Sequence, residues 1–393
     1  MAVVLSVAKL TPGQERYYER SVAAGLDDYY AGRGESPGVW IGRGARALEL
    51  EGVVHEGELG RLIRGLHPHT EKPLRARRQA RARVITIERI DPLTEERSIE
   101  TKKLAPVAGF DLVFSPPKSV SVLHALGDEE TRRAISEAHL SAWQGALGYL
   151  EDEACVTRRG AQGVNREHAS GFVAAAYQHR TSRAQDPHLH THVIVANMAQ
   201  SPSDGKWRTL DGEPILRSYR LAAGYLYQAQ LRSELTRPLG VEWDEPHKGM
   251  AELRHVPREV IREFSTRRAQ VVEQLEQSGG SGFHAAQVAA LETRERKEYV
   301  DLIGLREDWR ARAAEHGLGR RELKQLLGRV RPQEPSREAL LQLARQMLGP
   351  GGLTERQTAF SAPEAVMAWA NAHRAGASVD HVRRLAPRLV RTV

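Results

Sequence analysis

Cysteine is almost absent from this sequence. The chain has a single cysteine, Cys155, which excludes an intramolecular disulfide and any zinc site built from several thiolates. Such cysteine usage is typical of a protein that stays in a reducing cytoplasm. No apolar run is long enough to span a membrane, and the opening MAVVLSVAKL is too short for the apolar part of a signal peptide. We therefore expect a soluble, cytoplasmic protein without membrane insertion.

The sequence also lacks the phosphate-binding loop GxxxxGK(S/T), so we expect no ATP site of that kind. It contains no internal repeat and no low-complexity tract. What it has in excess is positive charge, because 57 Lys and Arg outnumber 50 Asp and Glu and give a formal net charge of +7. A basic balance of this size favours an anionic partner, most simply nucleic acid.

Hydrophobic periodicity predicts an α+β fold: an antiparallel or mixed sheet flanked by helices, with a mostly helical C-terminal third. Strands are expected at VVLSVAKL, GFDLVF, GFVAAAYQHR and HTHVIVANM, and an exposed ribbon strand at RVITIERI. Helices are expected near 11–26, 55–66, 129–151, 221–235, 256–277, 284–292 and 302–316. A further helix is expected after SPPK, capped by Ser115.

Three segments follow from these patterns. Residues 1–315 are expected to form the main domain, and residues 316–348 a helical extension and linker. The glycine-rich GPGGLT indicates a linker, so residues 349–393 are expected to start a further helical domain or to form a short tail.

Three histidines alternate along one predicted strand, in QDPHLHTHVIVAN. Alternate residues of a strand point to the same face, so these imidazoles can converge on one point. His190 and His192, together with a histidine from a neighbouring strand, give three nitrogen donors with open positions, which suits a catalytic metal. His179 and His188 compete for the third place, and His179 is favoured because His188 follows Pro187 in an expected loop. The alternative is that these histidines line a polar cavity or a hydrogen-bonded sheet edge.

Four of the ten tyrosines stand in two adjacent pairs, in ERYYER and DDYYAGRG. Neighbouring residues of a helix diverge by about 100°, so one ring of each pair is available for chemistry. A histidine-bound metal and a basic surface then favour phosphodiester chemistry. A phenolate attacks phosphorus, and the 5′-phosphotyrosine keeps the energy of the broken ester, so the strand can be resealed without ATP. Phenol has a pKa of about 10, so it needs help from the metal and from a base.

These stretches resemble the TrwC/TraI-type (MobF) conjugative relaxases, members of the HUH endonuclease superfamily. The resemblance runs through LSVAKLTPGQERYYER, DDYYAGRGESPGVWIGRGA, GFDLVFSPPKSVSVLHALG, AAYQHRTSRAQDPHLHTHVIVAN and KWRTLDG, over residues 5–210, and continues more weakly to about residue 313. It implies an HUH palm and a site- and strand-specific DNA nickase and transesterase. Such an enzyme cleaves one strand at a plasmid origin of transfer through a tyrosine and religates it after conjugative transfer.

The resemblance also assigns roles to individual residues. It places the metal ligands at His179, His190 and His192, the nicking tyrosine at Tyr17 and the tyrosine of a second transfer at Tyr29. The second members of the pairs, Tyr18 and Tyr30, complete the candidate catalytic set, and the choice between Tyr29 and Tyr30 stays open. Asp111 is the acid that would orient a ligand imidazole and accept the tyrosine proton. The implied cofactor is a divalent ion, Mg²⁺ or Mn²⁺ before Zn²⁺ or Ni²⁺.

The partner implied by the resemblance is origin-of-transfer DNA, as a single strand beside a hairpin. The candidate contacts to its phosphates are Arg75, Arg77, Arg78 and Arg81 in RARRQARAR, with Lys118 and Arg183 nearer the metal. Other relaxosome proteins and a type IV secretion coupling protein are expected partners of a monomer encoded by a bacterial plasmid or mobile element. The tail after Leu353 resembles the opening helices of the helicase part of large family members.

Three other functions are compatible with parts of the pattern. A rolling-circle replication initiator of the HUH class uses the same chemistry, but its nucleophilic tyrosine normally follows the histidine motif, whereas Tyr17 and Tyr29 precede it here. A non-catalytic DNA-binding accessory protein would carry a vestigial metal site. A zinc hydrolase acting on small molecules would use a metal-bound water and would not need the tyrosines.

Overall fold

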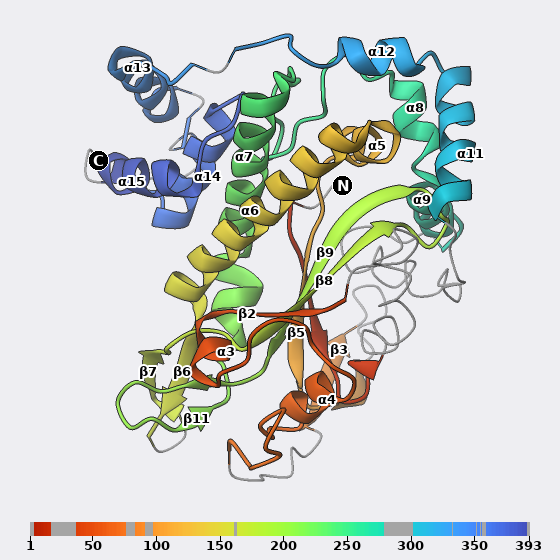
Figure 1. The fold of residues 1–393 in the computed structure, drawn as a ribbon. Coiled ribbons are helices and arrows are strands. Elements are labelled where there is room, and N and C mark those ends of the chain that lie inside the picture. The colour runs from red at the N-terminus through yellow and green to blue at the C-terminus, as the bar shows by residue number, and fades with distance from the viewer. Residues whose placement is uncertain are drawn as a thin grey trace.

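A five-stranded antiparallel sheet forms the centre of the computed structural model (Figure 1). The strand order is β1-β5-β9-β8-β2. These strands are β1 (Ser6–Leu10), β2 (Val39–Ile41), β5 (Gly109–Phe114), β8 (Ala174–Thr181) and β9 (Pro187–Ala196). The structure describes residues 4–16, 37–75, 83–90, 97–160, 163–278, 302–331, 333–350, 352–353, 355 and 359–390. The prediction of an α+β fold around an antiparallel sheet is confirmed.

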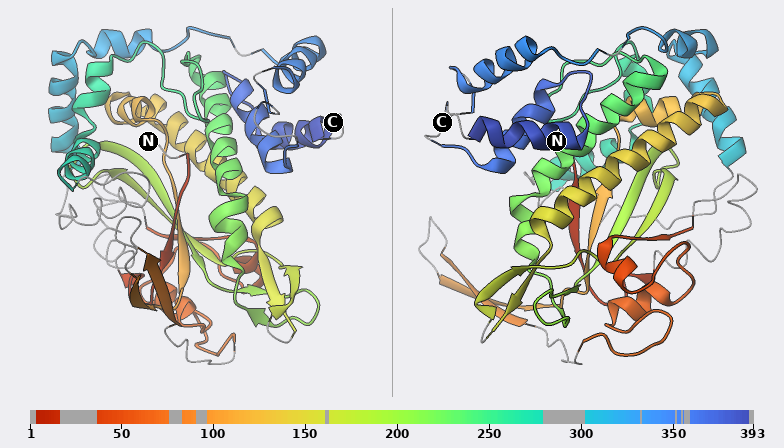
Figure 2. Two further views of the ribbon diagram at one scale, coloured as in Figure 1. Left: turned by 180° about the vertical axis from the view of Figure 1, so that it is seen from behind. Right: turned by 60° about the vertical axis from the view of Figure 1, so that its left-hand side comes forward.

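Helices cover one face of this sheet (Figure 2). They are α5 (Lys118–Leu126), α6 (Glu129–Ala154) and α7 (Arg220–Leu239). Strand residues of one parity, such as Leu112 and Val193, share a hydrophobic cluster with Trp143 of α6 and Leu226 of α7. The next residues along each strand therefore point to the opposite face.

A smaller core covers part of that opposite face. Ile194 of β9 and Tyr177 of β8 pack there with Trp40 of β2. The helices α3 (Arg43–Ala47) and α4 (Glu58–Ile63) complete this core. Because His190 and His192 have the same parity as Ile194, they extend the same face beyond the small core.

Further elements surround the sheet. Three two-stranded ribbons are β3 (Arg83–Ile90) with β4 (Arg97–Leu104), β6 (Val156–Arg159) with β7 (Asn165–His168), and β10 (Ala199–Gln200) with β11 (Trp207–Arg208). A π-helical turn, η2 (Pro214–Ser218), precedes α7. The other helices are α8 (Arg258–Glu263), α9 (Thr266–Ser278), α11 (Leu302–Glu315), α12 (Arg320–Gln325), α13 (Arg337–Leu348), α14 (Ala362–Ala372) and α15 (Val379–Val390). The exposed ribbon predicted at RVITIERI is confirmed, since Val84 is 54% exposed.

Two helix predictions are wrong in detail. The single helix expected over residues 256–277 is two helices: α8 ends at Glu263, with the buried Phe264 as its C-cap, and α9 begins at Thr266. Ser115 does not cap α5, which begins after Pro117 without a side-chain cap. Two prolines disfavour helical backbone in the residues before them, so the chain stays extended there. The expected helix over 284–292 lies outside the described residues.

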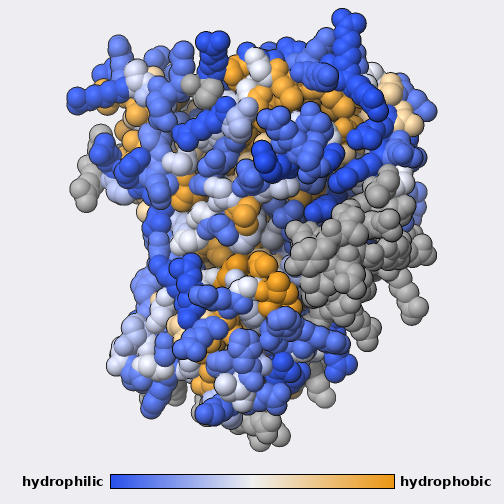
Figure 3. All heavy atoms as spheres, in the orientation of Figure 1, coloured by the Kyte–Doolittle hydropathy of each residue, from blue (hydrophilic) through white to orange (hydrophobic). Residues whose placement is uncertain are grey.

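The surface of the described part of the chain and the apolar character of its helices can be compared with what the sequence predicts. Most of the described side chains on the face shown in Figure 3 are hydrophilic. Among the helices that the structure describes, none combines the length and the apolar character that a membrane span requires.

Helices α14 and α15 pack against α7, so residues from both ends of the chain share one core. Trp369 and Val382 belong to the same hydrophobic cluster as α6 and α7. The buried Arg232 of α7 donates hydrogen bonds to the carbonyl oxygens of Gly249, at 3.0 Å, and Ala370, at 2.8 Å. The division into segments at residues 315 and 348 stays a prediction.

A glycine makes the close approach of the C-terminal helices to α7 achievable. Gly376 has φ +88°, and a Cβ there would lie 2.2 Å from Ser233 N and 2.3 Å from Ala229 O. We expect Gly376→Ala to lower the free energy of unfolding by about 3 kcal/mol, measured by urea denaturation, because helix backbone cannot move aside cheaply. Gly317→Ala is the matched control: its φ is +78°, but nothing lies within 4 Å, so about 1 kcal/mol is expected. Equal losses would contradict the packing described here.

Candidate metal centre

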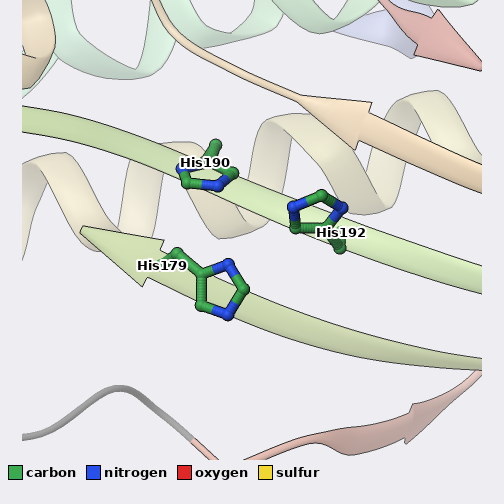
Figure 4. Close-up of side chains that lie close together, drawn as sticks. All are labelled: His179, His190 and His192. Carbon is green, nitrogen blue, oxygen red and sulfur yellow. The ribbon is translucent and has the colours of Figure 1, made fainter. Parts of the chain in front are cut away.

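Three imidazoles meet on the sheet face opposite α6 and α7 (Figure 4). His179, near the end of β8, lies directly across from His190 of β9, and His192 follows two residues later. The ring centroids are 5.1 Å apart for His179 and His190, 5.3 Å for His179 and His192, and 5.1 Å for His190 and His192. One nitrogen of each ring lies within 4.8 Å of the others. The predicted convergence of these three histidines is confirmed.

His188 has a different place from the one expected. It belongs to β9, which begins at Pro187, so the prediction that it lies in a loop is wrong. Proline is tolerated as the first residue of a strand, because its missing N–H costs no ladder bond there. The ring of His188 stacks on that of His190, with centroids 4.5 Å apart. Among the described residues, the group of donors close enough to share a metal contains His179, His190 and His192 but not His188.

Hydrogen bonds orient two of the three rings. His192 Nδ1 lies 2.9 Å from Asp111 Oδ1 and 3.0 Å from Oδ2, and Asp111 comes from the neighbouring strand β5. His190 Nδ1 lies 2.9 Å from the backbone oxygen of His188. An Nδ1–H that donates to oxygen leaves the Nε2 lone pair for a metal ion. Asp111 is thus adjacent to the ring that the resemblance expects it to orient.

Burial keeps the ring of His190 and that of its stacked neighbour His188 neutral. Burial lowers the pKa of His190 well below its ordinary value, and the neighbouring histidines lower it further. Burial, with a contribution from Lys118, lowers the pKa of His188 to about 3. Neutral imidazoles offer a lone pair where protonated ones would repel a cation. Three imidazole donors close enough to share one ion therefore fit a divalent metal ion.

The carboxylate of Asp111 is expected to tune this site. We expect Asp111→Asn to lower the affinity for Mn²⁺ by about 10- to 100-fold, because the neutral amide supports the His192 ring less well. Isothermal titration calorimetry on the intact chain measures this change. Asp204→Asn, in the turn between β10 and β11, is the control and is expected to bind Mn²⁺ like the parent chain. Unchanged affinity in Asp111→Asn would argue that the carboxylate has another role.

A buried chain of hydrogen bonds supports β9 from behind. Thr191 lies between the two ligand candidates and points to the helices, where its Oγ1 is 2.8 Å from His139 Nε2. His139 Nδ1 is 2.9 Å from the hydroxyl of Tyr227. Burial lowers the pKa of His139 to about 3, so the ring stays neutral. His139 lies in the apolar stripe of α6 with Ile135 and Ala142, and a polar residue in such a stripe was the available signal in the sequence.

The described residues that were predicted to contact DNA lie in separate segments and do not form one group as the three histidines do. Arg75 is half-buried, with its Nη1 3.3 Å from Asn197 O, and burial lowers its pKa. Lys118 is also largely buried, and its ammonium donates to Pro187 O at 2.8 Å. Burial lowers the pKa of Lys118 to about 8. Arg183 lies in the turn between β8 and β9. Outside the described residues lie Arg77, Arg78, Arg81, Tyr17, Tyr18, Tyr29 and Tyr30.

Comparison with known proteins agrees with this geometry. Residues 12–316 match the TrwC relaxase family. The chain is 31% identical over 322 residues to the multifunctional conjugation protein TraI of Escherichia coli, and 32% identical over 285 residues to that of strain K12. These matches cover 79% and 70% of this chain, but it spans only 16% and 14% of the TraI proteins.

Solved structures extend the likeness to three dimensions. A copper-bound conjugative relaxase TrwC in complex with oriT DNA is 32% identical, with a TM-score of 0.63. TrwC complexed with a 27-mer DNA comprising the recognition hairpin and the cleavage site is 30% identical, with a TM-score of 0.62. Each alignment covers 80% of this chain and 99% of the solved chain. With the family match spanning most of its length and including the histidine strand, this chain belongs to the TrwC family of conjugative relaxases.

Proposed function

We propose that this protein nicks one DNA strand at an origin of transfer, remains joined to the 5′ end through a tyrosine, and later reseals the strand. The observation that carries this proposal is the group of His179, His190 and His192 on one face of the sheet, with Asp111 on the ring of His192. Family membership supports it, and the TrwC structures named above contain oriT DNA.

The three histidines would hold one divalent ion, Mg²⁺ or Mn²⁺ in preference to Zn²⁺ or Ni²⁺. When bound, such an ion polarises the scissile phosphate and stabilises charge in the transition state. Tyr17 loses its phenolic proton and its oxygen forms a new bond to phosphorus. The bond from phosphorus to the 3′ oxygen breaks, and that oxygen takes up a proton. Asp111 is the candidate base, and Tyr29 the candidate for a second transfer.

The chain length permits Tyr17 to act at the histidines. Leu10 ends β1, which lies two strands from β9, and its register partner Gly109 lies opposite Ala196. Strand spacings put Leu10 roughly 17 Å from His192. The seven residues from Leu10 to Tyr17 reach at most about 25 Å when extended. Residues 11–14 form a turn, with Gln14 N donating to Thr11 O at 3.2 Å, so the segment spans less than this limit, and the position of the Tyr17 phenol at the metal centre is part of the proposal.

The proposed DNA partner is a single strand beside a hairpin. One of the similar TrwC structures holds a 27-mer with both the recognition hairpin and the cleavage site. The arginine-rich segment 75–83 and Arg183 are the candidate phosphate contacts, because guanidinium groups bind phosphate oxygens well. We further propose that the protein acts as a monomer in the bacterial cytoplasm, with other relaxosome proteins and a type IV coupling protein as its partners.

The test is a cleavage assay on the intact chain with Mg²⁺ or Mn²⁺ and a supercoiled plasmid that carries the cognate origin. The expected product on a denaturing gel is DNA with protein covalently attached at the 5′ end and a free 3′ hydroxyl at the other end. Cleavage that leaves a free 5′ phosphate would support a hydrolase with a water nucleophile. Binding without cleavage would support an accessory protein.

A further inference from the structure

The turn that joins the two ligand-bearing strands is not held by regular strand pairing. His179 pairs with His190, but the register then shifts between His179 and Thr181, so that Thr181 pairs with Pro187. Gln185, in this turn, has φ +60°, a left-handed conformation that costs energy for a residue with a side chain. Bonds within the turn, from Ser182 N to Asp186 O at 2.9 Å and from Gln185 N to Ser182 O at 3.1 Å, close it locally, and contacts with helices join it to the rest of the fold.

Helices supply these contacts at four residues between Gln185 and Leu189. Trp309 Nε1 of α11 donates to Gln185 O at 3.0 Å, and Thr266 N of α9 donates to Asp186 Oδ2 at 3.0 Å. Helix α5 makes two further bonds. Its Lys118 Nζ donates to Pro187 O at 2.8 Å, and its Ser121 Oγ accepts from Leu189 N at 3.2 Å. Figure 1 shows α9 and α11 beside the ends of β8 and β9. Three helices thus bind the residues that lead into His190, the first candidate ligand of β9.

Asp186 is the centre of this arrangement. Its side chain is 1% exposed, and its carboxylate accepts hydrogen bonds from both Thr266 N and, at 3.2 Å, Thr266 Oγ1. A carboxylate at the start of a helix satisfies free N–H groups and interacts favourably with the helix dipole. Here the capping carboxylate comes from a turn 80 residues earlier in the chain. The same bonds that begin α9 therefore hold the turn in place.

We propose that the turn between the ligand strands is tied to α9 by Asp186 and to α11 by Gln185 O, and that Asp186 is thereby a positioning residue of the metal centre. Removing the tie would let the turn shift, and His190 would move relative to His179 and His192. A ligand set that is misplaced by a fraction of an ångström binds its ion less well. The effect on metal binding stands by itself, whereas any effect on DNA cleavage rests on the proposed function.

The test compares two capping aspartates by Mn²⁺ titration calorimetry on the intact chain, with thermal unfolding in EDTA as the measure of stability. Asp186→Ala is expected to lower Mn²⁺ affinity about tenfold or more. Asp186→Asn keeps one acceptor for Thr266, so its Mn²⁺ affinity is expected to lie between those of Asp186→Ala and the parent chain. Asp128→Ala is the matched control, because Asp128 caps α6 through Thr131 N at 2.9 Å, on a helix that carries no ligand. It is expected to lose stability but not Mn²⁺ affinity.

Parent-like Mn²⁺ affinity in Asp186→Ala would overturn the inference and leave Asp186 as a helix cap only. If Asp186→Ala does not fold, Trp309→Phe replaces it, since phenylalanine keeps an aromatic ring but loses the bond to Gln185 O. A several-fold loss of Mn²⁺ affinity is then expected, and no loss would overturn the inference. A parent chain that binds Mn²⁺ but cleaves no DNA would remove the proposed function and leave this inference standing, whereas a parent chain that binds no Mn²⁺ would overturn it.

Discussion

His190→Ala is expected to abolish metal-dependent DNA cleavage and to weaken Mn²⁺ binding by more than about 100-fold. Even the loss of a partner that only orients a ligand costs about 10- to 100-fold in metal affinity, so loss of the ligand itself must cost more. The three ring centroids lie 5.1, 5.1 and 5.3 Å apart, so His190 is one of three similarly placed donors. Calorimetry and the plasmid cleavage assay measure the two effects.

An exposed histidine provides the control for this experiment. His168 lies on β7, on the surface, and His168→Ala is expected to bind Mn²⁺ and cleave DNA like the parent chain. His188→Ala keeps all three proposed donors and removes only the ring stacked on His190, so an intermediate effect is expected. Parent-like cleavage by His190→Ala, or cleavage in thoroughly chelated buffer, would remove the metal from the mechanism.

Tyr17→Phe is expected to lower the rate of the first cleavage by a factor on the order of 10⁴ and to abolish the covalent adduct. Phenylalanine keeps the ring but has no oxygen to attack phosphorus, and the other tyrosines are not expected to replace it efficiently. Mn²⁺ affinity is expected to remain unchanged, because the phenol is not a proposed ligand. The measurement is the yield of protein–DNA adduct on denaturing gels, together with calorimetry.

Tyr225→Phe is the matched control, because it removes a phenolic oxygen on α7, outside the site. This variant is expected to cleave DNA like the parent chain. An undiminished adduct in Tyr17→Phe would assign the first cleavage to another tyrosine, with Tyr29 and Tyr30 as candidates. Undiminished cleavage without an adduct would indicate a water nucleophile. His190→Ala loses metal affinity and Tyr17→Phe retains it, so the pair separates metal binding from the chemical step.

Alternation along a strand was enough to predict that His190 and His192 share a face, because a period of two is a local property of the backbone. The choice between His179 and His188 needed the pairing of two strands. The pairing of β8 with β9 puts His179 across from His190, while His188 stacks beside it. Local patterns were also enough for four of the five strands of the central sheet and for most helices, but not for β2 or for the break between α8 and α9.

Asp111 shows the limit of sequence reasoning from the residues alone. Nothing local distinguishes it from the other acidic residues, and the resemblance was needed to single it out. It meets His192, 81 residues away, only because β5 pairs with β9. Lys118, at a helix start, was predicted to contact phosphate, and only the structure shows that its ammonium donates to Pro187 O. Its contact with DNA stays a prediction.

The sequence by itself determined the α+β class, the face on which the strand histidines lie, and the basic character that favours nucleic acid. Only the tertiary structure decided which histidine completes the group, that Thr191 is supported by His139, and that Asp186 connects the ligand turn to α9. The physical reason is the range of the interactions. Backbone periodicity and proline act over a few residues, whereas these contacts join segments 52 or 80 residues apart, which meet only when the chain folds.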